Sequence, residues 1–139
     1  MVTAVVTTNP DDRRAHLGMI QAVIARLASN SFLVKGWSIT ITGALLALAA
    51  REHLSVMALV AMVPISAFWV MDANFLTLET QYRNLFDQAR RNDVEVYHMK
   101  APGATWRTRL TAGTSWSVLL VHGAMLVGSA VVAAVIRGA

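Results

Sequence analysis

A chain of 139 residues that is 55% hydrophobic and only 14% charged is too apolar for an ordinary soluble domain, in which roughly a quarter of residues are charged. The deficit lies in three long apolar blocks, which predict one all-α, polytopic membrane domain with three transmembrane helices. No cysteine is present, which excludes disulfides, cysteine-ligated metals and thiol catalysis. The net charge of +4 is small and reports first on membrane orientation, so we expect no nucleic-acid partner.

The N-terminal region predicts a helix that starts near residue 10. Residues 1–8 lack the basic start and the long apolar core of a cleavable signal peptide. Asn9 and Pro10 then form a helix start, followed by two acidic residues. We expect an amphipathic helix over 10–28, with a break at 29–31. It either lies in the headgroup plane or packs against the segment after the second span, and its regularly spaced apolar residues favour packing: Leu17, Ile20, Ile24 and Leu27.

The first two predicted spans form an antiparallel hairpin. Span one covers 32–50 and carries Gly43 and Ala47, a pair of small residues that permits close helix approach. A three-residue loop leads to span two over 54–71, an uncharged block of about 27 Å as a helix. Pro64 should kink this span, because proline removes a helical hydrogen bond.

Residues 72–91 predict a cytosolic helix that continues span two into water. The apolar residues change at Asp72 from continuous to periodic, with steps of three and four. Such a stripe must pack on protein, and its members are Phe75, Leu78, Tyr82, Leu85 and Ala89.

The C-terminal part predicts a polar, irregular segment and then span three over 113–136. In span three, Ala124 and Gly128 are four residues apart and suggest a tightly packed face. With the N-terminus inside, ten of the twelve basic residues fall on the inner side, and only Arg51 and Arg137 fall outside. This bias predicts a cytoplasmic N-terminus and an outer C-terminus. Three tryptophans agree, because each lies near the inner end of a span: Trp37, Trp69 and Trp116.

Three charged residues near the inner end of span two are candidates for pore lining or signal coupling. Asp72 and Glu79 are seven residues apart on one helix face, and Arg83 follows Glu79 by four. In one interpretation they form an acidic ring at a cytosolic pore mouth or contact a ligand. In the other, Glu79 and Arg83 form a salt bridge on the helix surface, and Asp72 marks where the helix leaves the membrane. Asp72 needs a cationic partner at the lipid boundary, and Lys35 or Arg109 lies at the expected depth.

His122, near the middle of span three, is the fourth candidate. An ionisable side chain at that depth marks a functional site or a neutral imidazole bonded to a neighbouring helix. We expect no second ionisable group at its depth, which argues against a proton-coupled transporter. Hydroxyl side chains at Ser38, Thr40 and Thr42 either line a lumen or bond to their own helix. The scattered histidines form no metal site, and no motif points to a cofactor or to catalysis.

A motif around the end of span two resembles a group of small bacterial multi-pass membrane proteins. Its elements are Phe68-Trp69, Asp72, Phe75-Leu76, Glu79, Tyr82-Arg83 and Leu85-Phe86, with Asn30-Ser31 and Lys35 upstream. The layout over about residues 10–91 also resembles the SLATT type of membrane effector, although span three is an addition. The resemblance implies oligomers that perturb the membrane in bacterial nucleotide-signalled and anti-phage conflict systems. This chain has no recognisable sensor domain, so we expect the signal to come from a partner protein.

The sequence therefore predicts an oligomeric effector or channel-like protein of the bacterial inner membrane. Its partners would be the lipid bilayer, further copies of the chain, and a cytosolic or membrane protein. The alternative is a non-catalytic scaffold or accessory subunit that docks a partner through its cytosolic helices. A transporter subunit is a third hypothesis.

Overall fold

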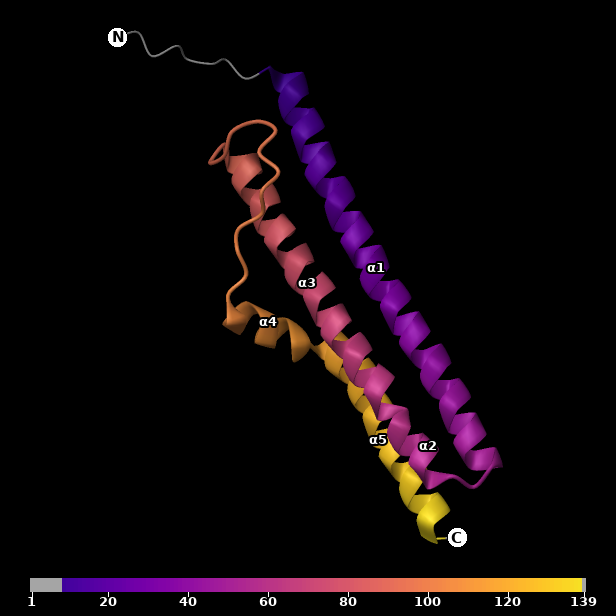
Figure 1. The fold of residues 1–139 in the computed structure, drawn as a ribbon. Helices are drawn as coiled ribbons and strands as arrows, with labels where there is room; N and C mark the ends of the chain where they lie inside the picture. Colours follow the sequence, from indigo (N-terminus) through magenta and orange to yellow (C-terminus); the bar gives the residue numbers. More distant parts are fainter. Residues whose placement is uncertain (1–8, 139) are drawn as a thin grey trace.

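The computed structural model describes residues 9–138, which form five α-helices and no strand (Figure 1). The N-terminal segment for which we expect no signal peptide lies outside these residues. The helices are α1 (Pro10–Arg51), α2 (Ser55–Val60), α3 (Met62–Arg91), α4 (Trp106–Gly113) and α5 (Trp116–Gly138). Within the described part, three segments are long and apolar enough to cross a membrane: α1, the α2–α3 pair and α5. The all-α class and the number of candidate spans are confirmed.

The first helix is continuous, so the predicted division into 10–28 and 32–50 is wrong. α1 runs for 42 residues, about 63 Å, without a break at 29–31. Serine and asparagine weaken a helix chiefly when their side chains compete for its backbone. The Ser31 hydroxyl instead donates to Asp72 on α3, and packing along α3 supports the helix on both sides of this point.

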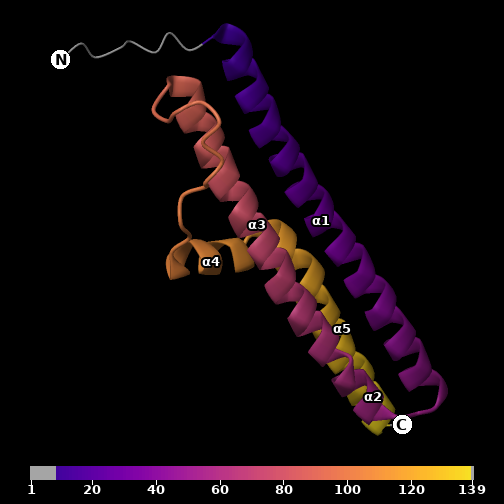
Figure 2. The same ribbon diagram turned by 45° about the horizontal axis from the view of Figure 1, so that its top comes forward.

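The N-terminal half of α1 packs against the C-terminal half of α3, and the two helices run side by side in both views (Figures 1 and 2). Ile20, Leu85 and Ala89 form a buried cluster, with Leu17 and Ile24 packed against it. The apolar face of this half of α1 is therefore covered by α3 and is not free to face a headgroup plane. The packed alternative is the correct one. We call residues 10–31 with residues 73–91 the polar hairpin.

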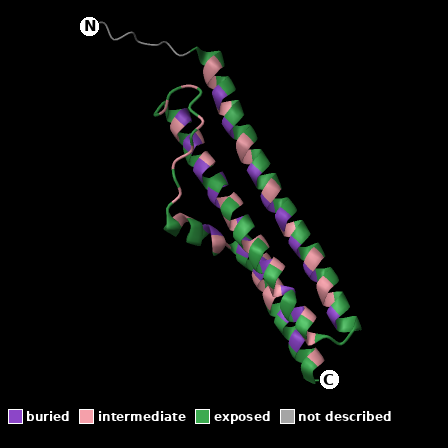
Figure 3. Ribbon diagram, in the orientation of Figure 1, coloured by how far each residue is buried: buried purple, intermediate pink, exposed green. Residues whose placement is uncertain are grey.

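The buried face of α3 is rotated relative to the predicted stripe. Leu85 and Ala89 are buried as expected, but Leu78 is 42% exposed and Phe75 is half-buried. Asp72 and Glu79 are buried instead, and Figure 3 shows buried positions recurring at intervals along α3. The rotation follows from Asp72, whose carboxylate must face α1 in order to pair with Lys35.

Span two is divided at Ala61, three residues before Pro64. The proline ring clashes with the carbonyl four residues earlier, that of Val60, which is the last residue of α2. The expected interruption is confirmed. Residues 52–54 form the short turn between α1 and α2, which the predicted antiparallel pairing of spans one and two requires.

The third span begins at Trp116 rather than at 113, and residues 106–113 form a separate helix, α4. Figures 1 and 2 show α4 crosswise to α3, at the end where α5 begins. The Trp69 indole N–H donates to the Gly113 carbonyl at 2.8 Å and so ties the α4–α5 junction to α3. At the opposite end, Ala49, Ala58 and Ala133 pack together, which brings α1, α2 and α5 into one bundle.

The predicted small-residue pairs take no part in this packing. Gly43, Ala47 and Ala124 are exposed, and Gly128 is half-buried. A Cβ atom added at Gly43 or Gly128 would meet no other atom within 4 Å. These pairs therefore lie on the outer surface of the bundle.

Candidate functional site

A charged cluster lies inside the bundle, with Asp72 at its centre. The Asp72 side chain is fully buried, and the Lys35 ammonium lies 2.7 Å from each of its carboxylate oxygens. Ser31 donates a second hydrogen bond to Oδ1. Of the two cationic partners expected for Asp72, the structure has Lys35 in this place. Arg109 lies on α4, outside the cluster.

Local helix geometry explains how α1 supplies two of these groups. Ser31 and Lys35 are four residues apart, so their side chains share one face of α1. The Lys35 ammonium also donates to the Ser31 hydroxyl at 2.8 Å, which closes a triangle of contacts with Asp72. Ser31 was not among the expected site residues. Its four-residue spacing from Lys35 is the signal that could have identified it.

His122 of α5 completes the cluster. Its Nδ1 atom lies 3.8 Å from Asp72 Oδ2 and 3.1 Å from the Val118 carbonyl oxygen, which can only accept a hydrogen bond. That second contact places a proton on Nδ1. The Nε2 atom is buried and has no hydrogen-bond partner among the described residues. The imidazole stacks on the Trp69 indole, with ring centroids 6.1 Å apart.

The expectation that no ionisable group shares the depth of His122 is wrong. His122 lies near the middle of the apolar block 113–136, but α5 begins only at Trp116. Lys35 and Asp72 were assigned to the ends of spans, whereas both lie within continuous helices. The three helices therefore bring a lysine, an aspartate and a histidine to one level.

Further polar side chains continue from the cluster along the bundle interior. Ser38, Thr42 and Ser129 are buried, and the Ser38 hydroxyl donates to the Met125 sulfur at 3.8 Å. The hydroxyls of Thr42 and Ser129 have no hydrogen-bond partner within residues 9–138. We call Ser38, Thr42 and Ser129 the interior hydroxyl row.

The exposed hydroxyls of the spans behave differently. Thr40 donates to the Gly36 carbonyl and Ser66 to the Met62 carbonyl, each within its own helix. Ser38 and Thr42 thus face the interior of the bundle, and Thr40 faces its outer surface. The three residues do not share a lumen-lining face.

Glu79 and Arg83 form a separate ion pair on the polar hairpin. Arg83 donates from Nε and Nη2 to Glu79 Oε1 at 2.9 and 2.7 Å. The Glu79 side chain is 11% exposed and that of Arg83 is 64% exposed. This is the four-residue helix pair expected as the simpler interpretation.

The cluster can hold charge and protons away from water, because an ion pair, an imidazole and a hydroxyl meet within an apolar bundle. No group of three or more residues in the described part has the arrangement of a metal site. Comparison with protein-family models, with curated proteins and with solved structures gives no match to this chain. The geometry of this cluster, and of the helices that carry it, is therefore the basis for inferring a function.

Proposed function

We propose that the protein is a homo-oligomeric, channel-like effector of the bacterial inner membrane, in which the polar hairpin controls the spanning bundle. The observation that carries this proposal is the continuity of α1 and α3 through the level of the buried cluster. A displacement of the hairpin would be transmitted along both helices to the apolar ends. The Lys35–Asp72 pair lies where the two parts of each helix meet.

The lengths of the apolar segments support this placement in a bilayer. From Lys35 to the end of α1, and from His122 to the end of α5, the helices extend about 24 Å. From Asp72 back to the start of α2 they extend about 26 Å. A bilayer core is about 30 Å thick, so the cluster would lie at its inner boundary. The polar hairpin would then project into the cytoplasm, as the basic residues predict.

Helix α4 supports the same boundary. It lies crosswise to α3 at the level where α5 begins (Figures 1 and 2). Its Trp106 and Leu110 are 67% and 59% exposed, and its Arg107 and Arg109 are also exposed. An exposed combination of aromatic, aliphatic and basic side chains is typical of a helix in the headgroup region.

The buried cluster supplies a discrete switch for such an effector. Breaking a buried ion pair leaves an uncompensated charge, so intermediate positions of α1 against α3 are disfavoured. A partner that binds the polar hairpin could shift the bundle only by preferring a second arrangement. Exposed Gly43, Ala47 and Ala124 offer faces through which further copies could associate in the membrane.

Flux through proteoliposomes tests the proposal. We expect Lys35→Met with Asp72→Leu to change ion or dye efflux several-fold, because the double variant removes the switch without leaving a lone charge. The control is Arg51→Gln with Glu52→Gln, which removes an exposed ion pair from the outer turn. The channel-like function is wrong if the protein forms oligomers but wild type, double variant and control all retain the dye.

A non-conducting scaffold is the second candidate. It is favoured by the outer surface of the bundle, where the Thr40 and Ser66 hydroxyls bond to their own helices and offer nothing to an aqueous lumen. A scaffold would bind a stoichiometric partner through the polar hairpin. Charge reversal at Arg83, which is exposed on that hairpin, would release the partner, whereas reversal at Arg51 would not.

The conflict-system role is a proposal that depends on the resemblance of the motif at residues 68–86. Cells that carry the gene with its neighbours should resist phage infection, and Asp72→Ala should abolish the resistance if the cluster is needed. Unchanged plaque counts with and without the intact gene set would remove this role and leave the membrane function to be tested by flux.

A further inference from the structure

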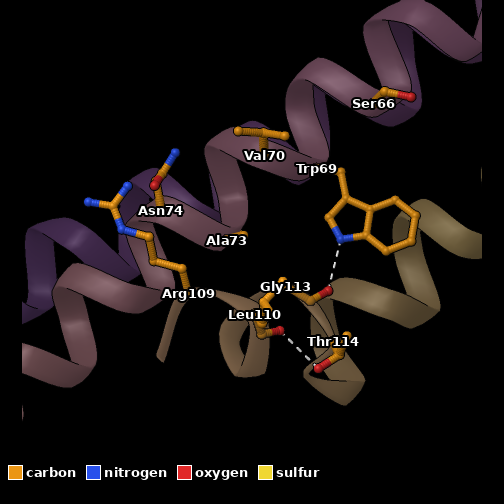
Figure 4. A pocket seen from close by; sticks show the side chains of 9 residues that line it. All are labelled: Ser66, Trp69, Val70, Ala73, Asn74, Arg109, Leu110, Gly113 and Thr114. Carbon is orange, nitrogen blue, oxygen red and sulfur yellow. Dashed lines mark hydrogen bonds between the residues drawn. The ribbon is translucent and has the colours of Figure 1, made fainter. Parts of the chain in front are cut away.

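A groove of about 530 Å³ lies between α3, α4 and the start of α5 (Figure 4). Its apolar lining includes Trp69, Val70 and Ala73 of α3 and Leu110 of α4. The groove is open at the surface, where Val70 is 62% exposed. Its size lies within the roughly 300–1,000 Å³ of ordinary small-molecule sites.

The two ends of the groove differ in polarity. Asn74 and Arg109 line one end, and Figure 4 shows Arg109 extending from α4 toward Asn74. Ser66 lines the other end, about 12 Å further along α3 toward α2, and its hydroxyl is already bonded to the Met62 carbonyl. The groove thus has one polar end, formed by Arg109 and Asn74, and its remaining length is apolar.

The charge at the polar end is not neutralised within the protein. No aspartate or glutamate lines the groove, and Arg109 forms no ion pair with any described residue. A guanidinium binds phosphate through paired hydrogen bonds, and Asn74 can donate further ones. The polar end is therefore complementary to an anionic phosphate group.

We infer that this groove binds one anionic phospholipid of the inner leaflet. The phosphate would lie between Arg109 and Asn74, and one acyl chain would follow α3 past Val70 toward Ser66. The orientation agrees with the bilayer position argued above, because the polar end is next to α4 and the apolar end points toward the membrane core. The site does not require that the protein conducts ions.

Native mass spectrometry of the purified full chain in neutral detergent tests this site. The probes are phosphatidylglycerol and phosphatidylcholine with identical acyl chains. Both lipids carry the phosphate, but the choline cation of phosphatidylcholine would repel the Arg109 guanidinium. We therefore expect phosphatidylglycerol to bind about tenfold more tightly, and Arg109→Gln to make the two lipids bind about equally. The matched control is Arg107→Gln on the same helix, whose guanidinium lies 5.3 Å from the Trp106 ring and outside the groove. This variant should keep the preference within twofold.

A second variant tests the apolar part without changing charge. Val70→Trp fills the groove from an exposed position and should weaken both lipids at least fivefold. The inference is overturned if Arg109→Gln and Arg107→Gln reduce the preference equally, if phosphatidylcholine binds as tightly as phosphatidylglycerol, or if Val70→Trp changes nothing. Displacement of the lipid by millimolar inorganic phosphate would also overturn it, because it would indicate a site for free anions.

Discussion

The Lys35 ammonium lies 2.7 Å from both carboxylate oxygens of Asp72, although the two residues belong to different helices and are 37 positions apart in the chain. The aspartate is fully buried and the lysine side chain is 18% exposed. The contact therefore joins α1 to α3 through two charges that have little access to water. It determines which face of α3 is turned toward α1.

Removing one charge of this pair should be much more harmful than removing both. We expect Lys35→Met to lower the free energy of unfolding by about 3–5 kcal/mol, because Asp72 is left buried without a partner. Lys35→Met with Asp72→Leu should recover most of that loss. Thermal and denaturant unfolding in detergent measure the free energy of unfolding of the single and the double variant. As a control, Arg91→Met breaks the exposed pair with Asp93 and should cost less than about 1 kcal/mol. A double variant as unstable as Lys35→Met would contradict this assignment.

His122 should matter to folding through its volume more than through its polar atoms. Its Nδ1 bonds to a carbonyl of its own helix, and its Nε2 has no partner among the described residues. We expect His122→Leu to change the unfolding free energy by less than about 1.5 kcal/mol, because the volume is largely retained. His122→Ala should cost about 2–4 kcal/mol through the cavity beside Trp69. If both variants lose the same stability, the imidazole contacts with Asp72 are what hold α5 in place.

Gly43 tests whether the outer face of α1 is an association surface. A side chain added there meets nothing within 4 Å in the protomer, so Gly43→Leu should leave the melting temperature of the monomer nearly unchanged. If copies associate through Gly43 and Ala47, the larger side chain should shift the oligomer toward monomer by tenfold or more. Analytical ultracentrifugation in detergent measures the shift. Gly18→Leu, which also meets nothing within 4 Å but lies on the polar hairpin, is the control.

The absence of cysteine makes single-cysteine labelling a clean test of orientation. With a cytoplasmic N-terminus, Asp87→Cys on the polar hairpin should be protected from a membrane-impermeant maleimide in intact cells. Glu52→Cys in the turn between α1 and α2 should react. Both positions are exposed, so accessibility within the fold does not limit either reaction. The reverse labelling pattern would invert the proposed topology.

Tyr97 should titrate at a higher pH than an ordinary tyrosine. Its hydroxyl donates to the Asp12 carboxylate at 3.0 Å, and this hydrogen bond is the main reason that its pKa is raised above 10.0. Because the folded-state pKa is the higher one, the stabilisation is fully present below about pH 10 and is lost as the pH rises through the raised pKa. Absorbance titration of a Tyr82→Phe background reports Tyr97 alone. Asp12→Asn should return the midpoint toward 10.0, and an unchanged midpoint would show that the hydrogen bond is not the cause.

Local sequence signals sufficed for several features of this protein. The long apolar blocks determined the all-α class and the three candidate spans. A helix makes its backbone hydrogen bonds within one segment, which an apolar environment requires. Pro64 determined the interruption of span two, and Asn9 with Pro10 determined where α1 begins. Each of these depends on groups within about four residues of one another along the chain.

Only the tertiary structure decided the continuity of α1, the rotation of α3 and the neighbours of His122. The break expected at 29–31 is overridden because Ser31 bonds across to Asp72, and the predicted stripe through Leu78 is displaced because Asp72 must face Lys35. His122 lies 3.8 Å from Asp72, although the two residues are 50 positions apart in the chain. Periodicity shows that a helix has a buried face, but the partner helix sets the rotation of that face, and that partner is distant in the sequence.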